Sequence, residues 1–257
     1  MTKVNLNADM GEGFGAYDIG DDAAMLDLVS SANVACGFHA GDPNVMRRVI
    51  KAAVDRGVSI GAHPGFNDLP GFGRRRIDMA MPDIEAMVAY QIGALQGIAA
   101  AGGTKVTHVK PHGALNNMAS EQDDVAGAIA TAVHGVDPGL ILVAVSGSSL
   151  FNACNAIGLP VASEAYADRS YADDGNMTSR KFSNAMIRNP AEAAEQVRRM
   201  VKDGIIVSTS GKEIPVNAQS ICIHGDEPTG PAVAKAVRAV LVAEGIEIVT
   251  LPEMGIA

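Results

Sequence analysis

The sequence predicts an α/β fold in which about seven parallel strands close into a barrel surrounded by helices. Short apolar runs recur along the 257 residues, and each is followed by a polar or glycine-rich loop and an amphipathic helix. Runs that are apolar on both faces are typical of buried parallel strands, and repeated strand–helix units favour a parallel sheet. No linker or shift in composition divides the chain. Since one β/α barrel can use all of a chain this long, we expect a single domain over residues 1–257.

The expected strands are runs of four to six mostly apolar residues. They cover residues 4–7, 31–36, 58–62, 106–110, 140–145, 160–164 and 220–224. Residues 246–251 are also apolar and could add an eighth strand. The segment 204–216 differs from the others, because two apolar runs flank a Ser-Gly-Lys sequence. This pattern predicts a β-hairpin that leaves the barrel.

The expected helices are bounded by capping residues. Asp42 can cap the helix that follows it, Pro43 suits the first helical position, and Gly57 suits a left-handed C-terminal cap. Residues 189–204 repeat this order of Asn, Pro and final Gly. Residues 84–103 place their large apolar side chains on one stripe, which is typical of a helix packed on a core.

The composition excludes several classes of partner. A formal net charge of −9 and a pI near 5.1 argue against nucleic acid and anionic membranes. No uninterrupted apolar run approaches the roughly 18 residues that a membrane span needs, and the first residues lack the apolar core of a signal peptide. Three distant cysteines without a CxxC spacing fit buried thiols in a reducing compartment. We therefore expect a cytoplasmic protein.

Titratable side chains follow the expected strands. Five of the six histidines lie at a strand end or in the loop just after it. In a parallel barrel the carboxyl ends of all strands open onto one face, so residues far apart in sequence would share one pocket. The candidates at this face are Asp9, Glu12, His39, His63, His108, Lys110, His112, Glu164, Asp168, Arg169, His224 and Asp226.

These residue types indicate acid–base chemistry. We assign the catalytic roles to Asp9, Glu12, His39, His63 and His112, because carboxylates and imidazoles together supply a general acid and a general base near neutral pH. Asp9, His39 and His63 also have the ligand types of a divalent metal site with an open position. No local metal-binding motif joins them, so the metal depends on the expected convergence alone.

A second group of residues would bind the substrate. Lys110 and Arg169 could hold a carboxylate or a developing oxyanion, and Asp168 and His224 would complete the pocket. An ammonium group that enters a core must be paired or catalytic. Each residue also has a structural alternative. A lone histidine at a strand end is commonly a satisfied structural residue, and Asp42 can be a helix cap only.

Several catalytic motifs are absent from the sequence. There is no GxxxxGK[ST] phosphate loop, no GxGxxG dinucleotide fingerprint and no GxSxG nucleophile elbow. The turn at residues 146–151 could bind an anion at a helix N-terminus, but this signal is weak. Any ATP site is therefore not carried by a recognisable motif of this chain.

Six motifs resemble the lactam-utilisation (LamB/YcsF) family. The likeness covers roughly residues 3–254, and the fixed order of the motifs makes it specific. In chain order they are NADMGEGFGAY (7–17), SANVACGFHAGDP (31–43), GAHPGFND (61–68), VKPHGALNN (109–117), DRSYADDG (168–175) followed by Arg180, and CIHGDEP (222–228).

The resemblance implies a distorted seven-stranded β/α barrel of the glycoside hydrolase/deacetylase type. Family members include one of the subunits of prokaryotic 5-oxoprolinase, which opens 5-oxo-L-proline to L-glutamate with ATP hydrolysis, in a complex with subunits B and C. ATP would phosphorylate the lactam oxygen and make the ring carbon electrophilic. Partner subunits would then supply or complete the ATP site. Arg180 becomes a further candidate for substrate binding.

The chain departs from the family pattern in two places, and two other functions stay open. Asn116 stands where the family pattern has a tyrosine, so substrate preference could differ. Residues 176–186 also differ from the sequence that is common in the family. One alternative is a metal-dependent deacetylase or amidase that acts alone. The other is a non-catalytic subunit that binds the substrate for its partners.

Overall fold

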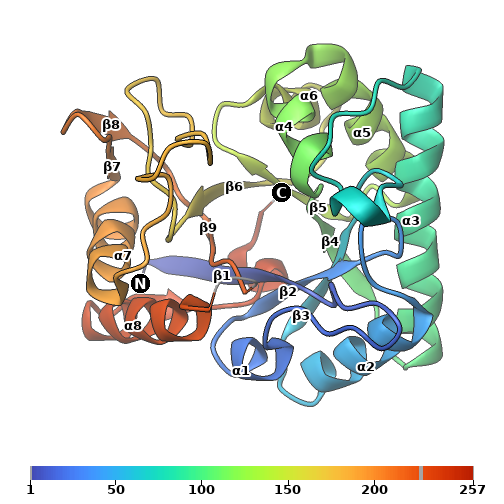
Figure 1. Ribbon diagram of the computed structural model, residues 1–257, viewed down its shortest axis with the longest axis horizontal. Helices are drawn as coiled ribbons and strands as arrows, with labels where there is room; N and C mark the ends of the chain where they lie inside the picture. The colour runs from blue at the N-terminus through green and yellow to red at the C-terminus, as the bar shows by residue number, and fades with distance from the viewer. Residues whose placement is uncertain (1, 226–227, 257) are drawn as a thin grey trace.

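The computed structural model describes residues 2–225 and 228–256, and it shows a closed ring of strands surrounded by helices (Figure 1). Asp226 and Glu227 lie outside the described residues. All neighbouring ring strands are parallel, and the pairing of β1 with β9 closes the ring, so the predicted seven-stranded barrel is confirmed. The ring strands are β1 (Lys3–Met10), β2 (Ser31–Ala35), β3 (Ser59–His63), β4 (Val106–Val109), β5 (Ile141–Val145), β6 (Val161–Tyr166) and β9 (Ser220–Cys222).

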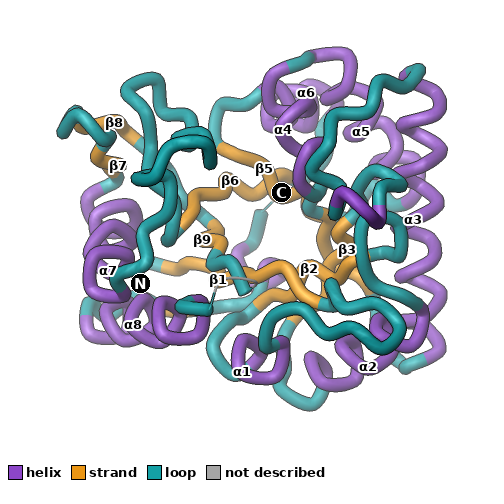
Figure 2. The backbone as a smooth tube through the Cα atoms, viewed as in Figure 1, coloured by secondary structure: helices purple, strands orange, loops and turns teal. Residues whose placement is uncertain are grey.

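Helices cover the outside of this ring (Figure 2). Four of them have a proline at the first or second position, as the capping pattern predicts for the helices after Asp42 and Asn189. The Asp42 side chain accepts the backbone N–H groups of Asn44 and Val45, so its role as a helix cap is confirmed. The α-helices are α1 (Asp22–Leu26), α2 (Pro43–Val54), α3 (Met81–Ala101), α4 (Gly113–Glu121), α5 (Asp123–Val136), α6 (Ser149–Ile157), α7 (Pro190–Arg198) and α8 (Gly230–Ala243).

The helix α3 begins three residues before the predicted range 84–103 and ends two residues before its end, and it is long and apolar. Its 21 residues include a stretch with a mean hydropathy of 1.2, so length and composition alone would allow it to cross a bilayer. In this fold, however, α3 packs one face against the barrel, and Ile84, Val88, Ile92 and Leu95 are fully buried there. A core helix of this length passes the same test, so the helix by itself does not indicate a membrane protein.

The last strand and the hairpin lie outside the ring. β10 (Glu247–Ile248) pairs with the first residues of β1 and is shorter than the apolar run at 246–251. β7 (Ile205–Val207) and β8 (Glu213–Pro215) form a separate antiparallel sheet within the segment 204–216. The loop between them touches the long connection after β6, since the N–H of Thr209 donates to the carbonyl of Tyr171 at 2.8 Å.

Short helical segments complete the chain's regular structure. The π-helix η2 (Arg199–Asp203) extends α7 and ends at Gly204, whose φ of 70° is left-handed as predicted for a C-terminal cap. The 3₁₀-helix η3 (Leu251–Met254) follows β10, and another 3₁₀ turn, η1 (Leu69–Gly71), lies after β3. Leu251 packs on Ile141.

The interior of the ring is largely polar, whereas its outer face is apolar. Val4 and Leu6 of β1 belong to the core between strands and helices, while the alternating residues Asn5 and Asn7 face inward and are fully buried. Asn7 donates to Glu164 at 3.0 Å, which is also buried. Buried polar groups of this kind must be satisfied by one another, so they form a hydrogen-bonded layer beneath the open end of the barrel.

Candidate active site

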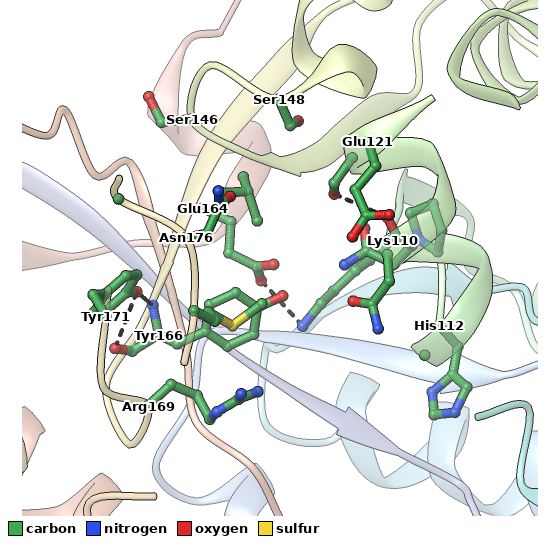
Figure 3. A pocket seen from close by; sticks show the side chains of 18 of the residues that line it. Lys110, His112, Glu121, Ser146, Ser148, Glu164, Tyr166, Arg169, Tyr171 and Asn176 are labelled. Atoms are coloured by element: carbon green, nitrogen blue, oxygen red, sulfur yellow. Dashed lines mark hydrogen bonds and ion pairs between the residues drawn. The ribbon is translucent and has the colours of Figure 1, made fainter. Parts of the chain in front are cut away.

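A cavity of about 1260 Å³ opens at the carboxyl ends of the ring strands (Figure 3). Most of the predicted site residues meet here, as the barrel geometry requires. His39 and Asp168 lie in the layer behind, each against a residue of the cavity wall. The predicted residues that line the cavity itself are Asp9, Glu12, His63, Lys110, His112, Arg169, Arg180 and His224.

Lys110 is the most completely paired group in the site. Its Nζ lies 3.0 Å from Asp9 Oδ1 and 3.1 Å from Glu164 Oε1, and it also contacts Asn7 Oδ1 and Cys222 Sγ. The dashed line to Glu164 in Figure 3 shows one of these ion pairs. Two carboxylates surround one ammonium group, so Lys110 balances the charge of the acids and presents no free cation to a ligand.

The pKa values of this group follow from its charges. Burial alone would raise the pKa of Asp9, but its electrostatic interactions with His63 and Lys110 outweigh burial and hold the pKa well below its usual value. Burial alone would lower the pKa of Lys110, but Asp9, Cys222 and Glu164 raise it well above its usual value. Asp9 is therefore a carboxylate and Lys110 an ammonium across the physiological range of pH.

Two histidines have their tautomers fixed by backbone carbonyls. His63 Nδ1 lies 2.6 Å from the carbonyl of Lys110, and His112 Nε2 lies 2.8 Å from the carbonyl of Phe72. A carbonyl can only accept, so each of these nitrogens donates its hydrogen. In a neutral ring the other nitrogen then carries a lone pair. His63 Nε2 and His112 Nδ1 are those nitrogens, and they lie 3.0 Å apart.

The same two lone pairs face carboxylate oxygens. Asp9 Oδ2 lies 3.3 Å from His63 Nε2, and Glu12 Oε1 lies 3.5 Å from His112 Nδ1 and 3.4 Å from His39 Nε2. Acceptors that converge in this way repel one another unless a proton or a cation lies between them. Ligands bound tetrahedrally to zinc are separated by about 3.4 Å, which agrees with these distances.

Four of these residues form what we call the histidine cluster: Glu12, His39, His63 and His112. All four are buried, and one ligand atom from each lies within 4.8 Å of the others. The donor set of three imidazoles and one carboxylate suits a divalent transition metal. The metal trio predicted from the sequence included Asp9, but Glu12 and His112 complete this group, because Asp9 turns one oxygen to Lys110.

His39 gives independent support for a ligand in the cluster. Its ring is 0% exposed, and neither ring nitrogen has a hydrogen-bond partner among residues 2–225 and 228–256. Burial and the neighbouring charges of His112 and His63 hold its pKa well below the usual value, and burial and His63 lower the pKa of His112 to about 3. Neutral imidazole is the form that binds a metal.

Backbone glycines make room for these rings. A Cβ atom at Gly73, whose φ is +60°, would lie 2.7 Å from His39 Cβ and 2.9 Å from His112 Cδ2. The two imidazoles stack with their centroids 3.7 Å apart, so neither ring can move aside without losing that contact. The loop after β3 is therefore built around the histidine cluster.

A histidine–aspartate pair stands on another part of the wall. His224 Nδ1 donates to Asp168 Oδ1 at 2.7 Å, and the backbone N–H of His224 donates to Asp168 Oδ2 at 3.1 Å. Burial would raise the pKa of Asp168, but the charge of His224 lowers it below the usual value. These bonds leave His224 Nε2 as the ring nitrogen that a ligand in the cavity can reach.

Arg169 is a buried cation on the cavity wall. It is 7% exposed, and its guanidinium group donates to the carbonyls of Ala185 and Thr178 at 3.3 and 2.7 Å. No carboxylate of the described residues lies within 4.0 Å of it. Burial, and then the positive charge of Arg180, lower its pKa below the usual value, so an anion beside it would be stabilised.

Tyr166 was not predicted, Glu164 was expected at this face but was assigned no role, and one residue was misplaced. Glu164 and Tyr166 both line the cavity, and Lys110 Nζ lies 5.4 Å from the centroid of the Tyr166 ring. The position of Glu164 at the end of the expected strand 160–164 was the signal that placed it at this face. The prediction that His108 stands at the mouth is wrong. It faces inward like Lys110 but one layer deeper, and it is fully buried.

Comparison with known proteins agrees with the motifs. The sequence model of the LamB/YcsF family matches residues 4–255, which is nearly the whole chain. The chain belongs to the LamB/YcsF family. A relative from Rhodopseudomonas palustris, named as the A-type subunit of 5-oxoprolinase, is 53% identical over 247 residues, which are 96% of this chain and 97% of that protein.

Solved structures show how this LamB/YcsF barrel relates to others. A lactam utilization protein from Thermus thermophilus superposes with a TM-score of 0.93 and 43% identity, over 97% of this chain and all of that one. A family 4 carbohydrate esterase from Streptomyces lividans in complex with acetate matches at a TM-score of 0.52 and 13% identity, covering 100% and 96% of the two chains. The second likeness shows that the two proteins share the deacetylase-type barrel.

Proposed function

We propose that this chain is the A-type subunit of an ATP-dependent 5-oxoprolinase, which cleaves 5-oxo-L-proline to L-glutamate together with subunits B and C. The observation that carries the proposal is the 53% identity over almost the full length of both chains to a protein of that name. The cavity supports it, because a carboxylate base, a histidine–aspartate pair and a buried arginine meet there.

The chemistry explains a need for ATP. A lactam is a resonance-stabilised amide, and its carbonyl carbon is a poor electrophile. Phosphorylation of the lactam oxygen would make that carbon open to attack by water. Since the sequence carries no phosphate-loop motif, we assign the ATP site to the partner subunits or to a site completed by them. We place the complex in the cytoplasm, where ATP is present and the buried cysteines Cys36, Cys154 and Cys222 stay reduced.

Arg169 would hold the carboxylate of the substrate. It is buried and lines the cavity, whereas Lys110 is already paired with two carboxylates. A guanidinium group can bind a carboxylate through two parallel hydrogen bonds, which fixes its orientation. Arg180, which is exposed on the same loop, would add positive charge at the entrance.

Asp9 would act as the general base. Lys110 keeps Asp9 ionised and occupies Oδ1, so Oδ2 is the oxygen that accepts the proton of the attacking water. The water oxygen forms a bond to the ring carbon, and the carbon–nitrogen bond of the ring breaks. The phosphate then stays on the new carboxyl group, and hydrolysis by a second water releases phosphate and L-glutamate. The nitrogen leaves as an amine and needs a proton. His224, held by Asp168, would deliver that proton from Nε2.

The histidine cluster would hold a divalent cation. Glu12, His39, His63 and His112 present converging lone pairs at distances that suit one. When bound, such a cation polarises an oxygen of the substrate or of water. This observation also favours the second candidate function, a metal-dependent amidase that acts without ATP. The two differ in whether ATP and partner subunits are needed.

Glutamate release tests the proposal. The purified chain is assayed with 5-oxo-L-proline, alone and mixed with its two candidate partner subunits, with and without ATP. We expect glutamate only when all three subunits and ATP are present. Release by the isolated chain without ATP would favour the amidase, and no release from any mixture would contradict the proposed function. Arg47→Gln, a substitution at an exposed residue of α2, is the control and should leave glutamate release unchanged.

A further inference from the structure

A pair of buried residues, His108 and Asn33, lies directly beneath the site. Both side chains are 0% exposed and neither lines the cavity, so neither can touch a substrate. His108 Nε2 lies 3.1 Å from Asn33 Oδ1, and Asn33 Nδ2 lies 2.9 Å from Asp9 Oδ1. The pair therefore connects the interior of the barrel to one oxygen of the Asp9 carboxylate.

We propose that His108 and Asn33 are positioning residues, which hold the Asp9 carboxylate in the orientation that leaves Oδ2 to act as the base. The proposal rests on the proposed function, in which Asp9 takes a proton from water. Neither residue belongs to the predicted catalytic or substrate-binding sets.

The hydrogen positions of the pair follow from the carboxylate. Asp9 can only accept, so Asn33 must turn its Nδ2 group towards it, and the second hydrogen of that group goes to Asn7 Oδ1 at 2.8 Å. Asn33 Oδ1 then faces His108, and an oxygen without a hydrogen needs a donor. His108 Nε2 must therefore carry the hydrogen. Each hydrogen bond that Asn33 makes with His108, Asp9 and Asn7 then has one donor and one acceptor.

The rest of the His108 ring agrees with this tautomer. Burial, and then the charge of Lys110, lower the pKa of His108 to about 3, so the ring is neutral and Nδ1 carries a lone pair. The hydroxyl of Thr107 lies 2.9 Å from Nδ1 and 3.1 Å from the carbonyl of Ile60, and it donates its single hydrogen to one of these two acceptors at a time. The ring thus has a partner on each nitrogen.

The backbone is built to admit this ring. A Cβ atom at Gly61 would lie 2.2 Å from His108 Cδ2 and from Nε2, so only glycine leaves the space. The register of β3 against β4 also shifts between Ile60 and Gly61. A bulge of this kind re-aims a side chain beside an active site.

The consequence for Asp9 is a fixed division of its two oxygens. Oδ1 accepts from Asn33 and from Lys110, while Oδ2 lies towards the histidine cluster, 3.3 Å from His63 Nε2. Without the Asn33 donor, Lys110 alone would hold Oδ1, and the carboxylate could rotate about its Cβ–Cγ bond. A base that rotates loses reactive geometry while the substrate still binds.

Steady-state kinetics of the three-subunit complex test the proposal. His108→Leu removes the donor to Asn33, whereas His108→Gln can keep an N–H group near the place of Nε2. We expect His108→Leu to lower kcat by about ten- to a hundred-fold with little change in KM, and His108→Gln to restore most of that loss. His134→Gln, an exposed histidine on α5, is the matched control and should leave both constants unchanged.

A double-mutant cycle separates positioning from a general effect on folding. If His108 acts through Asp9, then adding His108→Leu to an Asp9→Asn chain should cost no further activity. Independent losses that multiply in the double variant would overturn the proposal. A rise in KM with unchanged kcat would overturn it as well, because the substrate and not the base would then be affected.

Two measurements do not depend on turnover, so failure of the proposed function would not hide the result. Long-range ¹H–¹⁵N spectra of the labelled chain should show His108 with its hydrogen on Nε2, and hydrogen on Nδ1 would overturn the proposal. Crystal structures should show the Asp9 carboxylate rotated in His108→Leu and in place in His108→Gln. An unchanged carboxylate in His108→Leu would overturn the proposal, whatever the complex catalyses.

Discussion

Two regions of one cavity wall differ in how their charges are satisfied. Around Lys110, one ammonium group meets the carboxylates of Asp9 and Glu164 and the amide oxygen of Asn7. In the histidine cluster, lone pairs face lone pairs, and His39 has no hydrogen-bond partner among the described residues. The charges of the first region are paired within the chain, whereas a bound cation would satisfy the lone pairs of the second. Both come from the same barrel face, so convergence alone does not reveal which groups need a ligand.

The largest expected effect comes from a change in the region around Lys110. Asp9→Asn keeps the shape of the side chain but removes the base, so we expect kcat for glutamate release to fall by about 10²- to 10⁴-fold. Glu164 remains to pair Lys110, so the change should leave the fold intact, which circular dichroism checks. Asp18→Asn, at a side chain that is 88% exposed, is the control. Full activity of Asp9→Asn would show that Asp9 is not the general base.

Removal of Arg169, which pairs with no described carboxylate, tests its contrast with the fully paired Lys110. Arg169→Gln deletes a buried charge that no described carboxylate pairs, and we expect KM for 5-oxo-L-proline to rise by about ten- to a hundred-fold with a smaller change in kcat. The measurement is the substrate dependence of glutamate release, with Arg47→Gln as the exposed control. An unchanged KM would mean that the substrate carboxylate is bound elsewhere.

The comparison also shows what the sequence could and could not predict. The barrel followed from apolar runs such as 140–145, because buried parallel strands need side chains that are apolar on both faces. The meeting of Asp9, His63 and Lys110 followed from the barrel. Which histidines face one another did not, because ring orientation depends on carbonyls such as that of Phe72, far away in the chain.

The depth of a side chain within the barrel also could not be predicted from the sequence. His108 and Lys110 are two residues apart on one strand and point to the same side, yet one lies under the site and the other in it. The sequence shows the direction of a side chain, whereas its height depends on where the ring strands end. Glu164 was expected at this face, but its ion pair with Lys110 could not be read from the sequence.

The pH dependence of stability tests the neutral state of His108. Its pKa is about 3 in the fold and about 6.5 in the unfolded chain, so the unfolded state binds more protons between these values. Stability is then fully present above about pH 6.5 and decreases as the pH falls, by up to about 1.4 kcal/mol per pH unit for this group. Denaturant unfolding from pH 7 to pH 4 should show a shallower loss for His108→Gln. An equal slope in both chains would contradict a neutral buried ring, and His134→Gln is the control.

The smallest expected effect concerns Asn116. It is 6% exposed and lines the cavity, so its amide can make one neutral hydrogen bond to a ligand. Asn116→Ala should raise KM by about two- to ten-fold and leave kcat unchanged. Comparison of 5-oxo-L-proline with larger lactams shows whether this position also sets preference. Asn155→Ala, on the exposed side of α6, should change nothing.

The divalent metal content of the purified chain tests most directly the claim that the histidine cluster needs a cation. Elemental analysis after dialysis against a zinc-containing buffer, followed by metal-free buffer, should find about one equivalent per chain. His39→Ala should lose that metal, and His224→Ala, a histidine of the same cavity outside the cluster, should keep it. No bound metal in the unmodified chain, or equal retention in His39→Ala, would contradict the account.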